Sequence, residues 1–427
     1  MKRGNVKALL PIGVFLILYL GLGILFEYGL QIPMGFYNIP IVVAFLAALL
    51  VACLQNRALS LDDKLLLMGK GVGDKNIIIM ILIFLTAGIF VGVVGRSSAD
   101  SVAYFLLSLV PAQFAVAVLF VVSCFVALAM GTSVGSITLI TPIALSVASV
   151  MGGAMFGDNL SFISDTTIAA CNGQGCPMRD KFRVNFAIAL PAALVSLLLI
   201  LVLSFGQSTG PLVLAPYSLI QMVPYLLVLV GGILGANVFL VLLLGIGSGA
   251  VIMLATGATA PTELLANMGS GAAGMYETAM VAILVSALCA LIRAHGGFDA
   301  LLNGIRRVFH GKKGGQLGMG LLVGTMDIAT ANNTVAIVMA NPIAKEMSQD
   351  YGISPRKTAS LLDTFSCIFQ GILPYGAQML VALSAASELG HELSAFQVIP
   401  NLFYPFLLLI SSLLFIFVLP PRKGDTL

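Results

Sequence analysis

The sequence predicts an all-α polytopic membrane protein made of two inverted-topology repeats. Three observations lead to this prediction: an apolar composition, apolar runs of membrane-spanning length, and a distribution of basic residues that sets an orientation in the bilayer. Of the 427 residues, 59% are apolar and 9% are charged, whereas an average soluble domain is about 25% charged. So few charged side chains cannot cover a water-facing surface of this size. The bilayer is therefore the expected solvent.

The composition also excludes several classes of function. The net charge is +3 and like charges form no run, so a nucleic-acid partner is not expected. The sequence contains no glycine-rich phosphate loop that opens a helix, no nucleophile elbow and no His/Cys metal cluster. We therefore expect neither an enzyme nor a bound cofactor.

Apolar runs of roughly 20 residues, the length that crosses a hydrocarbon core of about 30 Å, mark the predicted membrane spans. They lie at 8–30, 38–54, 76–95, 184–205, 217–234, 237–256, 276–294 and 397–419. The first run begins like a signal peptide, but it is too long and has no small-residue cleavage site, so we expect an uncleaved helix. Two further segments, 104–172 and 316–390, are apolar but interrupted by small polar residues.

The basic residues set the predicted orientation. Most of the 21 Lys and Arg residues fall in segments that can all face the cytoplasm at once: Lys2, Arg3, Lys7, Arg57, Lys64, Lys70, Lys75, Arg179, Lys181, Arg183, Arg293, Arg306, Arg307, Lys312, Lys313, Arg422 and Lys423. The connections 206–216 and 257–275 have no Lys or Arg, as outside loops should. The positive-inside rule therefore places both termini in the cytoplasm, with the chain in the cell inner (plasma) membrane.

This topology needs five crossings in each half, plus a segment that enters and leaves on the same side. A repeat with an odd number of crossings is inverted relative to the next copy. We therefore expect a first repeat at 1–210, with scaffold helices in 8–95 and transport elements in 104–205. The second repeat is expected at 211–427, with scaffold helices in 217–294 and transport elements in 316–419. Each repeat would contain a broken helix and a re-entrant hairpin.

An internal similarity supports the duplication. The stretch "GTSVGSITLITPIA" at 131–144 aligns with "ANNTVAIVMANPIA" at 331–344, which pairs Thr132 and Ser133 with Asn332 and Asn333. Downstream, 157–167 aligns with 362–372, and this alignment pairs three further positions: Asp158 with Asp363, Ser161 with Ser366, and Asp165 with Gln370. Glycines and the prolines Pro142 and Pro342 are expected to open the helices here, which a bilayer tolerates only beside protein or a water-filled cavity.

Four carboxylates, Asp158, Asp165, Asp327 and Asp363, lie within or beside these interruptions. A single Asp at the bilayer centre costs about 2.5 to 3.5 kcal/mol, so the four must face a cavity or bind something. Long stretches around them lack Lys and Arg, which suits a cation and repels an anion. The alternative for Asp158 and Asp363 is that they cap helices in interfacial loops.

Oxygen-rich neighbours make Asp165 the strongest candidate, because Ser164, Thr166 and Thr167 surround it in the sequence. Hydroxyl and carboxylate oxygens are hard ligands that suit Na⁺. We therefore expect a Na⁺ site at Asp158, Asp165 and Ser161, for which H⁺ would compete. Asp100, four residues after Arg96, is expected instead to form a helical ion pair.

At this point the sequence resembles a known family. Four blocks, "GTSVGSITLITPIALSVA", "GGAMFGDNLSFISDTTIAA", "MDIATANNTVAIVMANPIAKEM" and "LLDTFSCIFQGILPYGAQM", are similar in order and spacing to signature blocks of the NhaC-type sodium/proton antiporters of the ion transporter superfamily. Relatives of that family include malate/lactate exchangers. The resemblance covers most of residues 76–390. It implies an ion site at Asp158, Ser161, Ser164, Asp165, Thr166, Thr167, Asp327, Asn332, Asn333, Thr334 and Asp363.

The resemblance also implies a homodimer in which a rigid scaffold holds a moving transport domain. Phe162 stands where the family usually has proline, and Val134 and Tyr375 stand where it usually has tryptophan. These positions line the pocket, so they leave any organic solute unidentified.

The expected function is therefore secondary active transport. The first hypothesis is a Na⁺/H⁺ antiporter that exchanges Na⁺ for H⁺ by elevator-like alternating access, with the carboxylates as the shared site. The alternative is a Na⁺- or H⁺-coupled carrier of a small organic solute, such as an amino acid or a hydroxy acid like malate or lactate. Half-helix N-termini can hold a carboxylate without Arg, so the missing basic residues leave this alternative open.

Overall fold

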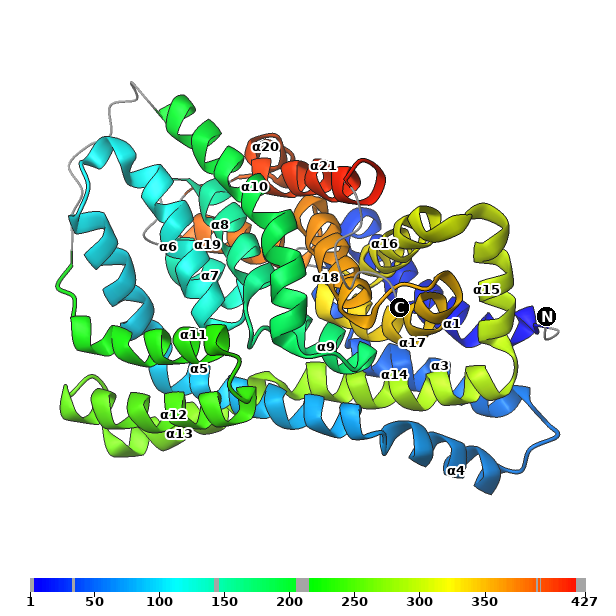
Figure 1. Ribbon diagram of the computed structural model, residues 1–427. Helices are drawn as coiled ribbons and strands as arrows, with labels where there is room; N and C mark the ends of the chain where they lie inside the picture. Colours follow the sequence, from blue (N-terminus) through cyan, green and yellow to red (C-terminus); the bar gives the residue numbers. More distant parts are fainter. Residues whose placement is uncertain are drawn as a thin grey trace.

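A computed structural model describes residues 4–32, 35–141, 146–204, 215–388, 391 and 393–419. These residues fold into packed helices (Figure 1). By length and composition, six helices in this part of the chain can cross a membrane, or seven if the bent pair Ala395–Asn401 and Phe403–Phe417 forms one span. The predicted all-α polytopic class is confirmed. Pro142, both chain ends and most of the 206–216 connection lie outside the described residues.

The first two predicted spans form a helical pair at the N-terminal end. The first runs from Val6 to Gly29 and contains α1 (Leu10–Leu16) and α2 (Leu22–Ile24), and the second is α3 (Ile41–Gln55). Phe15 stacks on Phe45 with ring centroids 4.1 Å apart, which joins the two helices. Leucines on the opposite face of α3, such as Leu50, are exposed, as a lipid-facing surface requires.

Residues Leu61–Val72, which include two of the lysines predicted to face the cytoplasm, Lys64 and Lys70, form α4. A capping box starts this helix, because Ser60 and Asp63 each bond the other's backbone N–H. Lys64 is buried, and its Nζ donates to the Cys53 carbonyl oxygen over 2.6 Å. Lys64 therefore does not face solvent.

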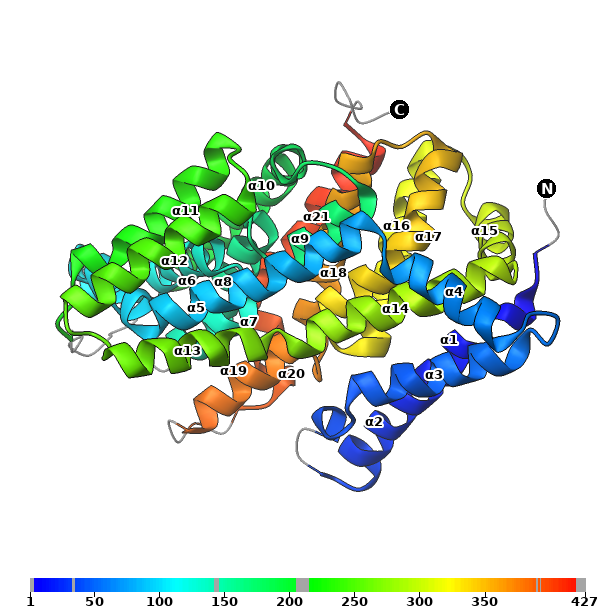
Figure 2. The same ribbon diagram turned by 90° about the horizontal axis from the view of Figure 1, so that it is seen from below.

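Two long helical runs cross the molecule side by side. One comprises α4 and α5 (Lys75–Ser108), and the other α13 (Pro261–Gly274) and α14 (Tyr276–Ala294); Figure 2 shows them packed together. A Cβ at Gly271 would lie 2.1 Å from the Gly88 carbonyl oxygen, so only glycine permits this approach. The prediction of an outside loop at 257–275 is therefore wrong, since most of this segment is helix α13. It forms a helix because its small residues pack on α5.

Two further helices match predicted spans: α11 (Val223–Leu234) and α12 (Val238–Ala255). Helix α15 (Gly297–Val308) follows α14 and lies outside the predicted spans. The predicted end of the third span at residue 95 coincides with a break inside α5, where Gly95 has φ 46° and ψ −149°. Only glycine adopts this conformation readily.

The two interrupted segments contain the same order of elements. A helix pair with a tight turn comes first, and a helix pair with a short break follows. The first set is α6 (Ala115–Met130), α7 (Ser133–Ile140), α8 (Val147–Leu160) and α9 (Asp165–Gln174), followed by α10 (Met178–Ser204). The second set is α16 (Gly311–Thr330), α17 (Asn333–Tyr351), α18 (Pro355–Ile372) and α19 (Ala377–Glu388), followed by α20 (Ala395–Val398) and α21 (Phe403–Phe417).

The tight turns at 131–132 and 331–332, called here the first and second hairpin turns, have matching backbone conformations. Gly131 and Ala331 are both left-handed, with φ 73° and 54°. Thr132 and Asn332 are both extended, and each side chain caps the next helix by accepting from a backbone N–H. These parallels support the predicted duplication. The inverted orientation of 1–210 and 211–427 stays a prediction.

Two expectations about the interruptions need correction. Pro342 does not open the chain, because it lies inside the continuous helix α17. The downstream alignment also fails: Asp158 is in the last turn of α8, whereas Asp363 is in the middle of α18. The breaks themselves lie at 161–164 and 373–376, so Asp158 and Asp363 do not occupy equivalent positions.

Candidate ion site

The first break, residues 161–164, brings a buried carboxylate and two serines together. Asp158 is 4% exposed, and its Oδ1 accepts a hydrogen bond from Ser164 Oγ over 2.5 Å. Its Oδ2 accepts from Ser133 Oγ, in the first residue of α7, over 2.8 Å. Both oxygens therefore have hydroxyl partners from different elements. Asp158 lies within α8 and caps no helix, which excludes the interfacial-cap alternative.

The second half of the chain also contributes to this site. Gln378, in the first turn of α19, donates from Nε2 to Ser133 Oγ over 2.7 Å. Sequence reasoning did not single out Gln378, although it lies in the last quoted block, directly after the second break. A polar residue just beyond a helix break was the signal that could have found it.

Asp165 begins α9 on the other side of the first break. Its Oδ1 accepts from its neighbour's backbone, Thr166 N, over 2.8 Å, and its carboxylate also bonds the side chain of Thr334. Thr334 follows the second hairpin turn, so both hairpins reach the site. The hydroxyls of Ser164 and Thr166 are 2.7 Å apart. Asp165 is partly exposed, whereas Asp158 is buried.

We call the side chains of Asp158, Asp165, Ser133, Ser164, Thr166 and Thr334 the carboxylate cluster. It combines two carboxylates with four hydroxyls, and it contains six of the predicted site residues. Such a set of hard oxygen ligands suits a cation. The N-terminal end of α9 also points at the cluster, where backbone N–H groups face a carboxylate.

A buried lysine lies beside the carboxylate cluster, which the sequence did not predict. Lys181 is 1% exposed and forms an ion pair with Asp363. Its Nζ also donates to Asn159 O over 2.6 Å and to Thr167 Oγ1 over 2.8 Å. The expectation that Lys181 faces the cytoplasm is wrong, and so is the expectation that Asp363 lacks a basic partner.

The helical period explains this error. Arg179 and Arg183 are four residues apart in α10, so they share one face, and both are exposed. Lys181 lies between them in sequence and therefore on the opposite, inward face. Asn185, one turn further on, also points inward and donates to Asn159 Oδ1 over 2.7 Å and to Asp363 Oδ2 over 3.4 Å.

Several predicted site side chains bond backbone groups instead of joining the cluster. Ser161 Oγ donates to Leu128 O over 2.8 Å, and Ser366 Oγ donates to Asp363 O over 3.0 Å. The others are Thr132 and Asn332, which cap helices, and Asn333, whose Oδ1 accepts from Thr334 N. Small polar side chains commonly satisfy nearby backbone groups in this way. The predicted Na⁺ ligand Ser161 is therefore a structural residue.

Asp327 occupies a different place. It lies in the last turn of α16, beside the second hairpin turn, and it is fully buried. Among the described residues neither of its carboxylate oxygens has a hydrogen-bond partner. The structure therefore does not bring Asp327 into the carboxylate cluster.

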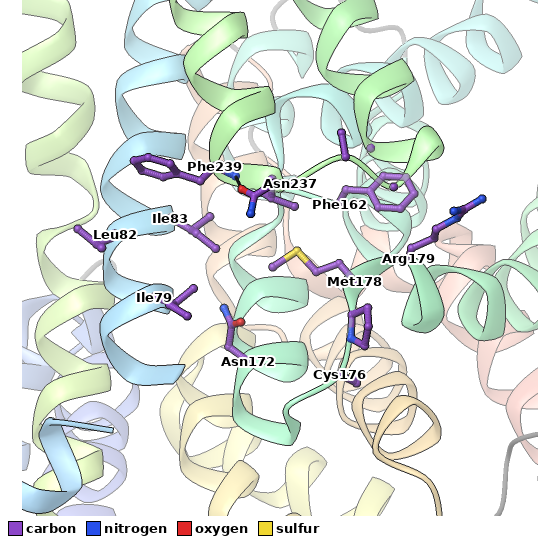
Figure 3. Close-up of a pocket in the computed structure, with 15 residues that line it drawn as sticks. Ile79, Leu82, Ile83, Phe162, Asn172, Cys176, Met178, Arg179, Asn237 and Phe239 are labelled. Carbon is purple, nitrogen blue, oxygen red and sulfur yellow. Dashed lines mark hydrogen bonds between the residues drawn. The ribbon is translucent and has the colours of Figure 1, made fainter. Parts of the chain in front are cut away.

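A cavity of about 490 Å³ lies on the scaffold side of the first break (Figure 3). Ile79, Leu82 and Ile83 of α5 line one wall, and Phe239 of α12 lies above them. Phe162, inside the break, lies opposite and stacks on Phe182 with ring centroids 4.5 Å apart.

The polar groups of this cavity are few. Asn172 lies on its lower side, and its Nδ2 is buried with no hydrogen-bond partner among the described residues. Arg179 lies at the rim and is exposed. The cavity is therefore a mainly apolar space lined by two amide side chains, Asn172 and Asn237, of which the Asn172 Nδ2 is buried without a partner among the described residues.

A second cavity, of about 410 Å³, lies between α4, α5 and α14 on one side and α9 and α17 on the other. Both cavities thus lie between α5 and elements that contribute to the carboxylate cluster.

Helix breaks and hairpin turns that meet at buried carboxylates define a polytopic membrane transporter. Residues 206–418 match the model described as "Na+/H+ antiporter family", and the chain belongs to that family. It is accordingly a secondary transporter and a multi-pass membrane protein.

Individual relatives add information about the fold. An "Uncharacterized protein" of Haemophilus influenzae is 31% identical over 112 residues, which are 23% of this chain and 22% of that protein. The match thus spans about a fifth of the curated relative. The Alcanivorax borkumensis YdaH transporter has a TM-score of 0.60 at 13% identity, over 96% of this chain and 98% of that one. Neisseria gonorrhoeae MtrF, described as illuminating a class of antimetabolite efflux pumps, has a TM-score of 0.59 at 14% identity, over 95% of this chain and 98% of that one. At this level of identity, the likeness to these two structures shows the fold of this chain and nothing further.

Proposed function

We propose that the protein is a Na⁺/H⁺ antiporter that exchanges Na⁺ for H⁺ at the carboxylate cluster. The observation that carries this proposal is the position of Asp158 and Asp165 on the two sides of one helix break, among hydroxyls from both hairpins. Na⁺ is the cargo. Carboxylate and hydroxyl oxygens hold it well, and the same carboxylates take up protons when Na⁺ leaves.

Exchange requires that the cluster opens to each side of the membrane in turn. We infer an elevator-like movement of the transport elements, α6 to α10 and α16 to α21, against the scaffold helices. The two cavities of about 490 and 410 Å³ support this inference, because they lie at the boundary across which the movement would occur. Competition of Na⁺ and H⁺ for one cluster then couples the two fluxes.

We also propose the plasma membrane as the location, with both termini in the cytoplasm, and a homodimer as the working unit. The distribution of Lys and Arg supports the orientation. Exposed leucines on α3 and α12, such as Leu50 and Leu240, leave apolar faces on the scaffold that lipid or a second copy must cover.

The test is transport by purified protein in liposomes under imposed Na⁺ and pH gradients. Asp158→Asn and Asp165→Asn should each abolish Na⁺-driven proton flux, because each removes one exchanging carboxylate. Asp100→Asn is the matched control: Asp100 also lies in a membrane helix but pairs with Arg96 at 3.8 Å and is no member of the carboxylate cluster. Full activity in both cluster variants would refute the proposal.

A second candidate function is cation-coupled transport of a small organic solute. The observation that favours it is the apolar cavity beside the first break, where Phe162 replaces the proline usual in the family and the Asn172 amide has no partner. The discriminating measurement is Na⁺-dependent uptake of labelled amino acids and hydroxy acids in the same liposomes. Uptake that Asp158→Asn abolishes would favour the carrier over the antiporter.

A further inference from the structure

Lys181 is buried, with 1% of its surface exposed, and its ammonium is surrounded by protein acceptors. Its ammonium has three N–H donors, and it has three partners: the Asn159 carbonyl oxygen, Thr167 Oγ1 and the Asp363 carboxylate. These partners come from α8, α9 and α18, and Lys181 itself from α10. Four elements of the transport region therefore converge on one buried positive charge.

The pair lies directly beside the proposed cargo site. Asn159 follows Asp158 in the chain, and Thr167 is two residues after Asp165. Asp158 and Asp363 are close enough to interact electrostatically, as are Asp165 and Asp363. The site thus holds three carboxylates and one ammonium, and the ammonium contacts only one of the three.

We propose that Lys181 is a resident cation of the site, which permanently occupies the position at Asp363 and leaves Asp158 and Asp165 as the exchanging pair. The inference rests on the proposed function. Asp363 then carries neither Na⁺ nor H⁺ during transport, so two carboxylates, not three, set how much charge each cycle moves. Lys181 is a positioning residue, because it acts through Asp363 and does not touch the cargo.

The reason for such an arrangement is physical. Three neighbouring carboxylates would each need a cation or a proton. A lysine that three buried acceptors hold in place neutralises one of these carboxylates, Asp363, in every state of the cycle. A buried ion pair with one partner removed leaves an uncompensated charge, which is strongly unfavourable. The pair must therefore be kept or removed as a unit.

This last point supplies the experiment. Four variants are compared in liposomes: Lys181→Gln, Asp363→Asn, the double variant Lys181→Gln/Asp363→Asn, and Lys64→Gln as the control. Lys64 is also buried, but its Nζ donates to the Cys53 carbonyl oxygen, and it has no part in the site. The measurements are the Na⁺-driven proton flux and the charge moved per Na⁺, taken from the membrane potential at which net flux stops.

The single variants should lose at least about tenfold in flux, because each leaves an unpaired buried charge. In Lys181→Gln the charge moved per Na⁺ should also change, since Asp363 becomes a third exchanging carboxylate. The double variant should recover most of the flux and the wild-type charge per Na⁺. Lys64→Gln should keep both values.

A purely structural pair predicts otherwise. If the double variant is folded, by its thermal unfolding temperature, yet as inactive as Lys181→Gln, the inference is overturned. An unchanged charge per Na⁺ in an active Lys181→Gln protein also overturns it.

The proposed function and this inference fail in distinguishable ways. If the wild-type protein exchanges no protons for Na⁺, the antiporter proposal fails. The inference is then decided by the increase in thermal stability that NaCl produces relative to choline chloride. Lys181→Gln should alter that increase, and the double variant should restore it; equal increases in wild type and Lys181→Gln would contradict the inference.

Discussion

Two serines of the first break, Ser161 and Ser164, allow a sharp test of the site. They have the same chemistry and lie three residues apart, but only Ser164 faces a carboxylate. Ser164→Ala removes the hydroxyl that donates to Asp158 Oδ1 over 2.5 Å and that also contacts Thr166 Oγ1. Ser161→Ala removes a hydroxyl that donates to the Leu128 carbonyl oxygen and accepts from Ile163 N.

The expected magnitudes differ for a physical reason. A hydrogen bond to a charged group contributes about 1.5 to 3 kcal/mol. Loss of the Ser164 hydroxyl destabilises the ionised carboxylate that Na⁺ needs, so the Na⁺ concentration for half-maximal exchange should rise about tenfold to 150-fold. Ser161→Ala leaves buried backbone groups unpaired, which should lower the free energy of unfolding by about 1 to 3 kcal/mol without changing Na⁺ affinity.

The assay combines two measurements on the same preparations. Half-saturation by Na⁺ comes from proton flux in liposomes over a range of NaCl at constant ionic strength. Stability comes from thermal unfolding in detergent. The reasoning is refuted if Ser161→Ala weakens Na⁺ activation as much as Ser164→Ala does, or if Ser164→Ala leaves it unchanged.

Two further predictions concern the close contacts that hold the site in place. Gly131→Ala should lower stability by about 1 to 2 kcal/mol, because φ is 73° there and the added Cβ would lie 2.6 Å from the Ile163 carbonyl oxygen; thermal unfolding measures this, and an unchanged midpoint would contradict it. Gly153→Val should cost about 3 kcal/mol or more, because a Cβ there would lie 2.0 Å from the Phe120 carbonyl oxygen, between α8 and α6. Gly152→Ala is its control, since the Cβ would approach only the side chains of Phe120 and Tyr404, at 3.2 Å or more. An equal loss of stability in the two variants would contradict the prediction that close contact between the α6 and α8 backbones makes Gly153 necessary.

The membrane spans were predictable because a bilayer of fixed thickness imposes a length on apolar runs. Predicted span 237–256 corresponds to α12 (Val238–Ala255), and residues 184–204 of predicted span 184–205 lie within α10 (Met178–Ser204). The helix α13 was missed for the same reason. Its small and polar residues do not form an apolar run, and it is stabilised by glycine contacts with α5.

The main site residues were also predictable, in part. Asp158, Asp165, Ser164 and Thr166 lie close together in the chain, so a local sequence pattern could indicate a common site. Ser133 was identified through the internal alignment and Thr334 through the family resemblance, and the structure places both just after the two hairpin turns. The pairing of Asp158 with Asp363 was wrong, because sequence similarity alone could not show that α18 continues well past Asp363 before it breaks.

The sequence by itself determined the solvent, most of the membrane spans and the identity of two acids that lack a basic neighbour in the chain. Only the tertiary structure decided which polar side chains meet. Ser161 and Ser164 differ in role because the chain turns through the break between them, so that one hydroxyl reaches a backbone carbonyl oxygen and the other reaches a carboxylate. Lys181 differs from Arg179 and Arg183 because the helical period turns it inward, where Asp363, distant in sequence, supplies the opposite charge.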